Sequence, residues 1–150
     1  NPVTSGPIVN DSLETSIDGV FACGNVLHVH DLVDYVSEEA DIAGKSASAY
    51  VKNGAKKKNV ISVIDVEKGN GVRYTVPQKI EVTDNNADVK VYFRVGKVFT
   101  DVILKAYIGD EIVANSKKRK MAPGEMEFIT VKKSILDKNP CGKLKIEIME

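Results

Sequence analysis

The chain has 150 residues, of which 43% are hydrophobic and 28% charged, and its formal net charge at pH 7 is zero. This composition is typical of a globular protein with one domain or two small ones. No apolar stretch reaches the roughly 20 residues of a membrane-spanning helix, and a neutral total argues against a dedicated nucleic-acid binder. We therefore expect neither a membrane nor a nucleic acid as the partner.

The neutral total hides a division along the chain. Residues 1–54 contain two basic residues against eight acidic ones, which gives −6, whereas residues 55–150 contain nineteen against thirteen, which gives +6. Because charge changes sign near Gly54, the sequence predicts two pieces. We assign residues 1–54 to the first piece, 55–59 to a charged linker and 60–150 to the second.

The first piece is expected to be a short α/β segment. Its apolar run Val20–Cys23 is typical of a buried strand, which Gly24 and Asn25 then end. From about Asp31, apolar residues recur at intervals of three and four, which predicts an amphipathic helix that stops at Asn53 and Gly54. The apolar positions are Leu32, Val33, Val36, Ala40, Ala43, Ala47 and Val51. Small residues around Gly44 predict close packing of this helix against a sheet.

The second piece is expected to be mainly β. Short segments rich in β-branched residues alternate with clusters of Gly, Asn, Asp and Pro, which favours an antiparallel β-sandwich of immunoglobulin-like size. The predicted strands are residues 60–66, 72–76, 79–83, 89–95, 102–108, 111–114, 126–131 and 144–149. Gly109 and Asp110 are predicted to form a hairpin turn, and Pro77 and Pro123 to lie at edges or turns.

One stretch of the first piece carries a recognisable motif. The matching positions are Thr15, Gly19, Val20, Phe21, Ala22 and Gly24, with Cys23 at a position for a small residue. This pattern resembles the C-terminal flavin-binding motif of the FAD-dependent pyridine nucleotide-disulfide oxidoreductases, the thioredoxin-reductase-like flavoproteins. The chain departs from the motif at Asn25, where the family usually has Asp. An Asn side chain removes the charge but keeps an oxygen acceptor.

The resemblance implies a cofactor and a set of binding residues. Gly24 would let FAD approach the backbone, and Asn25 would hold its ribityl chain. Asp34, Tyr35 and Val36, at the start of the helix, would lie near the isoalloxazine ring, where helix amides favour negative charge on a reduced flavin. The implied chemistry is hydride transfer between NAD(P) and FAD.

The resemblance covers residues 1–54 only. The chain has no glycine-rich dinucleotide-binding turn and no CxxC pair, so we expect the C-terminal part of a longer flavoprotein, with an accessory β-sandwich, that is inactive by itself. Its implied partners are the remainder of the flavoprotein and a redox partner protein, and a homo-oligomer is compatible with the sequence. The alternative is a non-enzymatic β-sandwich module for protein interaction or oligomerisation.

Both histidines of the chain, His28 and His30, lie between the motif and the helix. Side chains two residues apart on an extended segment point the same way, so the pair could bind a metal with Asp31 and Asp34. No third histidine exists, and we expect no metal. The resemblance implies a different role, in which the loop lies near the flavin and tunes its potential or shuttles protons. The simplest alternative is a pair of histidines that stabilises a loop.

The remaining candidate groups receive structural interpretations. Cys23 and Cys141 are far apart in the sequence, so we expect no disulfide and a reducing, cytoplasmic location. The runs Lys56–Lys58 and Lys117–Lys120 could be phosphate-binding patches, but a charged connector and a polar strand end explain them better. The opposite charges of the two pieces also suggest that they dock on each other or on charged partners.

Overall fold

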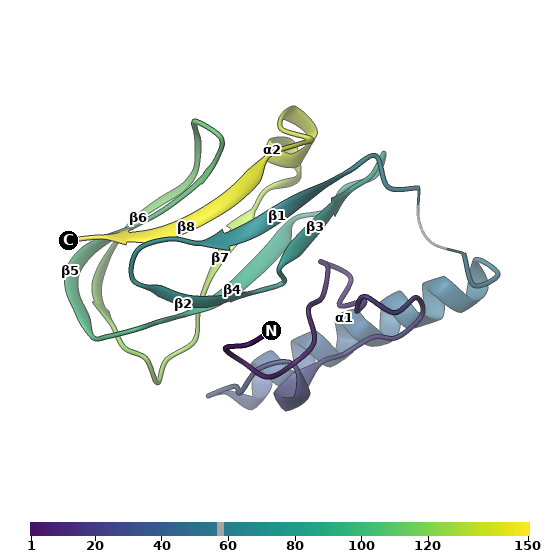
Figure 1. Ribbon diagram of the computed structural model, residues 1–150, viewed down its shortest axis with the longest axis horizontal. Coiled ribbons are helices and arrows are strands. Elements are labelled where there is room, and N and C mark those ends of the chain that lie inside the picture. Colours follow the sequence, from purple (N-terminus) through teal and green to yellow (C-terminus); the bar gives the residue numbers. More distant parts are fainter. Residues whose placement is uncertain (57–58) are drawn as a thin grey trace.

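The computed structural model describes residues 1–56 and 59–150 and has three layers (Figure 1). Two β-sheets pack face to face, and the N-terminal segment with its helix covers the outer face of one of them. Within the described residues the helices are α1 (Val33–Lys52) and α2 (Lys133–Lys138), and η1 (Gly24–Val26) is a 3-10 turn. The strands are β1 (Ser62–Lys68), β2 (Val72–Val76), β3 (Lys79–Val82), β4 (Val89–Val95), β5 (Phe99–Ile108), β6 (Glu111–Met121), β7 (Glu127–Val131) and β8 (Lys143–Met149).

The predicted β-sandwich is confirmed at the level of two packed sheets. One sheet has five strands in the order β3-β1-β8-β5-β6, and the other has three in the order β2-β4-β7. Burial alternates along β5 and β8, because successive side chains of a strand point to opposite faces. The inward-facing side chains, among them Phe93, Leu104 and Ile146, form the main core between the sheets.

The pairing is not antiparallel throughout. β8 runs antiparallel to β5 but parallel to β1, with Val66 opposite Leu144. The expectation of a purely antiparallel sandwich is therefore wrong at this position. The physical reason is the connection, since the chain leaves β7, makes the turn of α2 and enters β8 between two strands of opposite direction (Figure 1).

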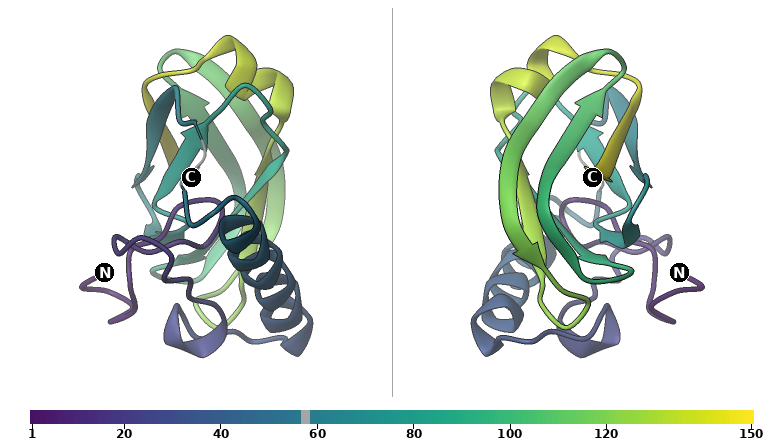
Figure 2. Two further views of the ribbon diagram at one scale, coloured as in Figure 1. Left: turned by 90° about the vertical axis from the view of Figure 1, so that its right-hand side faces the viewer. Right: turned by 90° about the vertical axis from the view of Figure 1, so that its left-hand side faces the viewer.

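The N-terminal segment and α1 dock on the outer face of the three-stranded sheet. Tyr74 and Val76 of β2 point away from the main core and form a second core with residues of the segment. The members of this second core are Val9, Leu13, Leu27, Ala43, Tyr74 and Val76. Val9 and Gln78 exchange two hydrogen bonds of 2.9 and 3.1 Å, which fasten the segment to the sandwich. The two side views in Figure 2 show α1 beneath the sheets, with β5 and β6 as a long pair on one side.

The predicted strand Val20–Cys23 does not form. Phe21 makes only an isolated bridge with Glu14, and Val9 makes another with Thr15. A strand needs a continuous ladder of hydrogen bonds with a neighbour. Here Ala22 donates to the carbonyl of Leu13, so the segment folds back on itself instead of joining a sheet.

The predicted helix is confirmed as α1, with Asn53 as its C-cap and Gly54 in the left-handed region at φ 68°. Of its small residues, Ala43 packs in the second core as expected, whereas Gly44 has no heavy atom within 4 Å of an added Cβ. Ala40 is also exposed, and Val33 and Val51 are 75% and 71% exposed. These four residues repeat at intervals of seven, four and seven, so they share one face of α1. We call Val33, Ala40, Gly44 and Val51 the bare face of α1.

The bare face gives a simple stability prediction. Gly44→Ala is expected to stabilise the chain by about 0.5–1 kcal/mol, because alanine restricts the unfolded backbone and meets no atom in the folded one. Gly69→Ala should act in the opposite direction, since its Cβ would lie 2.6 Å from the Cβ of Glu147. Thermal unfolding followed by circular dichroism compares the two. A lower melting temperature for Gly44→Ala would show that this face of the helix is covered.

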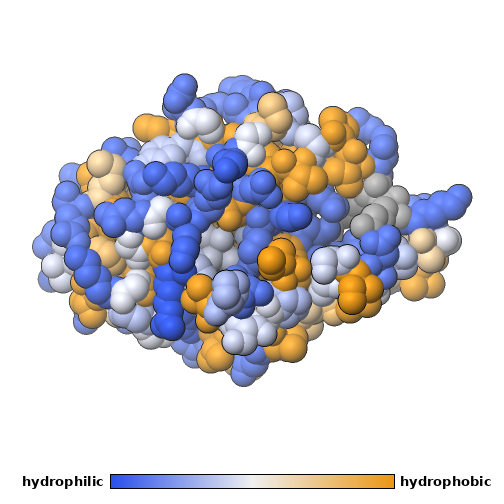
Figure 3. All heavy atoms as spheres, viewed as in Figure 1, coloured by the Kyte–Doolittle hydropathy of each residue, from blue (hydrophilic) through white to orange (hydrophobic). Residues whose placement is uncertain are grey.

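The charged and apolar residues are distributed unevenly over the surface. The lysine run Lys117–Lys120 lies within β6, which continues well past the predicted strand end at residue 114. Of the other run, Lys57 and Lys58 lie outside the described residues. In Figure 3 the left-hand part of the face is mainly blue, while orange groups gather toward the right-hand and lower parts. Among the described residues, no helix has the length and apolar character needed to cross a membrane.

Candidate functional site

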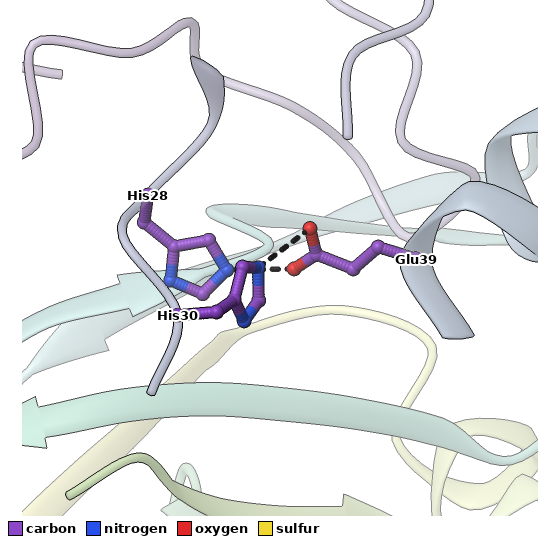
Figure 4. A group of neighbouring side chains, drawn as sticks. All are labelled: His28, His30 and Glu39. Atoms are coloured by element: carbon purple, nitrogen blue, oxygen red, sulfur yellow. Dashed lines mark hydrogen bonds and ion pairs between the residues drawn. The ribbon is translucent and has the colours of Figure 1, made fainter. Parts of the chain in front are cut away.

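Three titratable side chains meet between the N-terminal segment and α1 (Figure 4). The Nε2 atom of His28 lies 2.6 Å from Oε1 of Glu39, and Nε2 of His30 lies 2.9 Å from Oε2 of the same carboxylate. The three side chains are 0%, 1% and 2% exposed, respectively. We call His28, His30 and Glu39 the triad.

Local structure fixes each member of the triad. η1 turns the chain after Gly24, and the fully buried Leu27 then anchors the loop that carries both histidines. The side-chain oxygen of Asn25 accepts a 3.3 Å hydrogen bond from the backbone N–H of His30, which holds the loop closed. Glu39 comes from the second turn of α1 and points from the buried side of that helix toward the loop.

The Glu39 carboxylate is fully engaged by donors. Besides the two histidines, the backbone N–H of Gly24 donates to Oε2 over 2.8 Å. Burial by itself raises the pKa of Glu39, but the hydrogen bonds from His28 and Gly24 and the attraction to both histidines together hold the pKa below its ordinary value. On the histidines only Nε2 is satisfied, since Nδ1 of each is buried and has no hydrogen-bond partner among the described residues.

Aromatic rings surround the triad. The ring of His28 makes an edge contact with Tyr74, and Tyr35 of α1 packs edge-on against Tyr92 of β4. Tyr92 donates its hydroxyl to Glu38, which also forms an ion pair with Lys90. The hydrogen bonds from Lys90 and Tyr92 lower the pKa of Glu38, while burial raises the pKa of Tyr92. The Glu38 carboxylate therefore binds side chains of β4 and does not contact the histidines.

Two cavities reach the triad from different sides. His28 helps to line one of about 300 Å³, together with Arg73, Tyr74 and Arg94. Glu39 helps to line another of about 370 Å³, between α1 and the β4 side of the sandwich. The triad therefore lies between two cavities, although its own side chains are almost fully buried.

The residues predicted for the flavin site are partly brought together. Gly24 is buried and adopts φ 67°, and a Cβ added to it would lie 3.4 Å from Val36. Asn25 is exposed although its oxygen holds the loop, and Asp34 is exposed in the first turn of α1. Tyr35 packs against Tyr92 and Phe128. Cys23 and Cys141 are both free thiols.

Sequence reasoning singled out the two histidines but paired them with the wrong carboxylates. Asp31 instead accepts a hydrogen bond from the Met126 N–H and lies 3.6 Å from Arg94. Glu39 was missed as a site residue. The sequence did contain a signal for Glu39, which lies between Val36 and Ala43 on the apolar stripe of the helix. An acidic residue in such a stripe needs a buried partner.

Comparison of the chain with protein-family models, with curated proteins and with solved structures finds no significant match. The flavoprotein resemblance therefore depends on the motif residues themselves.

Proposed function

We propose that this chain supplies the closing turn and helix of the flavin site of an FAD-dependent, NAD(P)-linked oxidoreductase, followed by an accessory β-sandwich. Residues 1–54 would derive from a nucleotide-binding domain, and the remainder of the flavoprotein would be the main partner. Both cysteines are free, which fits a reducing compartment such as the cytoplasm. The chain by itself should be catalytically silent.

The observation that carries the proposal is the bare face of α1. A helix that only covers this sandwich needs one apolar side, and α1 uses that side on the second core through Ala43. The bare face adds a second, small and apolar side. Such a side is the kind that packs closely against a parallel sheet, as the helices of a doubly wound nucleotide-binding domain do.

The turn before α1 provides independent support. Gly24 takes a left-handed conformation that disfavours any side chain, as the motif requires where a ligand approaches the backbone. Val26, Val29 and Leu32, which follow it, are 65%, 66% and 52% exposed. Exposed apolar residues concentrated around a binding turn are typical of a surface that is covered in the complete protein.

The proposed chemistry assigns limited roles to this chain. The flavin, when bound, supplies the hydride chemistry between NAD(P) and the second substrate. Asn25 would hydrogen-bond a ribityl hydroxyl, in exchange for its present contact with the His30 N–H. The N-cap residue Leu32 makes no side-chain cap, so the amides of Asp34 and Tyr35, next to Val36, are available to stabilise negative charge on a reduced ring.

The test uses the complete reading frame that encodes this chain. We expect its product to purify with a flavin absorption spectrum and Gly44→Arg to abolish FAD retention, because the arginine would block the contact made by the bare face. Asn25→Ala should weaken retention by about tenfold, the effect of a lost hydrogen bond to ligand. Released flavin is quantified by fluorescence after denaturation of the protein.

The matched control is Lys52→Ala, an exposed change in the last turn of α1 and away from the flavin turn, which should leave FAD retention unchanged. The 150-residue chain alone should retain no FAD. A colourless product of the complete frame would overturn the proposal and favour the interaction or oligomerisation module. A stable FAD complex of the isolated chain would contradict the expectation that FAD binding needs the remainder of the flavoprotein.

A further inference from the structure

We propose that the triad is a binding site for one divalent transition-metal ion of the zinc class. His28, His30 and Glu39 would supply the three protein ligands, and the fourth position would stay open for water or another ligand. The inference uses only residues of this chain and stands whether or not the chain belongs to a flavoprotein.

The ligand set fits this class of ion. Two imidazoles and one carboxylate form a His₂Glu set, which zinc accepts readily, whereas calcium and magnesium prefer oxygen ligands alone. One ligand atom from each residue lies within 4.8 Å of the others. Ligands of a tetrahedral zinc ion are about 3.4 Å apart, given bonds of about 2.1 Å. The present contacts of 2.6 and 2.9 Å must therefore open by less than about 1 Å to admit the ion.

The second ring nitrogen of each histidine, Nδ1, is not a ligand of the proposed ion and needs a partner of its own. Nδ1 of both histidines is buried without a partner among the described residues. Buried polar atoms of this kind usually have a protein partner, an ordered water or an ion.

The surroundings hold the ligands in place for binding. Glu39 accepts a hydrogen bond from the Gly24 N–H, and the side chain of Asn25 accepts one from the His30 N–H. These hydrogen bonds orient the carboxylate and the histidine loop. The ion would replace the proton on each Nε2, and each neutral ring would then carry its one proton on Nδ1. A buried water at each Nδ1 would accept the hydrogen bond from that proton.

The first experiment uses the unaltered chain without a histidine tag. Because the protein has only two histidines, ¹⁵N-histidine labelling gives imidazole spectra of the triad alone. We expect one equivalent of zinc to shift the Nε2 resonance of both rings and to move their protons to Nδ1. Unchanged imidazole resonances after addition of one equivalent of zinc would overturn the proposal.

The second experiment measures affinity and coordination with variants. Cobalt should give the visible absorption of a tetrahedral site, and Glu39→Gln and His30→Gln should each weaken zinc binding at least about tenfold, as judged by competition with a chromogenic chelator. Glu38→Gln is the matched control and should bind like the parent, because Glu38 contacts Lys90 and Tyr92. If all three variants bound zinc with the same affinity, the ion would lie elsewhere and the proposal would be overturned. Circular dichroism of each metal-free variant checks that it is folded.

Discussion

Phe93→Ala is expected to cost about 3–5 kcal/mol of unfolding free energy, the usual range for deleting a fully buried phenylalanine. Phe93 is 0% exposed and lies on β4, the middle strand of the three-stranded sheet. Its ring faces the five-stranded sheet within the main core. Because small proteins are stable by about 5–15 kcal/mol in total, this variant should lose a large fraction of its stability.

Phe128→Ala is the matched control for that prediction. Phe128 lies on the neighbouring strand β7 and is 39% exposed, on the outer face near Tyr35 and Tyr92. Its loss should cost less than about 1.5 kcal/mol, because only part of the ring is removed from water. Urea unfolding of both variants, followed by circular dichroism, gives the comparison. Similar costs for the two variants would mean that the main core does not lie between the two sheets.

The eight strands could be predicted from the sequence because each carries its own signal. β4 and β8 alternate in hydrophobicity, and turn residues such as Gly109 and Asp110 separate neighbouring strands. Pairing direction has no such local signal, so the parallel pair β1–β8 was missed. The helix α2 was missed as well, because six residues are too few to show a helical period.

The first piece shows a different limit of sequence reasoning. The apolar run Val20–Cys23 has the composition of a buried strand, but a strand also needs a neighbour, and this chain places none beside it. For α1, the recurrence of apolar residues at intervals of three and four correctly predicted a helix. It did not reveal which part of the broad apolar stripe faces the sandwich, and the structure leaves Val33 and Val51 exposed.

The candidate site could be predicted only in part. The spacing of His28 and His30 marked them as a pair, since both side chains point the same way from the loop. The carboxylate that they contact could not be identified from spacing, because Glu39 is eleven residues from His28. The turn of the chain between η1 and α1 determines which acidic side chain lies next to the histidines. Asp31 and Asp34 are nearer in sequence but face other partners or solvent.

Glu39→Ala is expected to cost about 3–5 kcal/mol, because it leaves the Nε2 donors of two buried histidines and the Gly24 N–H without an acceptor. Glu38→Ala removes the adjacent carboxylate from the same helix. Its ion pair with Lys90 is 37% exposed on both sides and contributes less than about 1 kcal/mol, and the lost hydrogen bond from Tyr92 adds about 1 kcal/mol. In chemical denaturation at neutral pH, Glu39→Ala should therefore show a clearly lower unfolding free energy than Glu38→Ala, although the two substitutions are at adjacent positions.

Acid titration of stability tests the same carboxylate by a second route. The pKa of Glu39 is lower in the folded chain than its ordinary value of 4.5, so the unfolded chain takes up the proton more readily. The stability that Glu39 contributes is fully present above about pH 4.5 and is lost as the pH falls through the folded pKa. The gap in unfolding free energy between the parent and Glu39→Ala should accordingly narrow below pH 4.5. A gap that stays constant into strong acid would mean that Glu39 acts by packing alone and that its charge does not hold the two histidines.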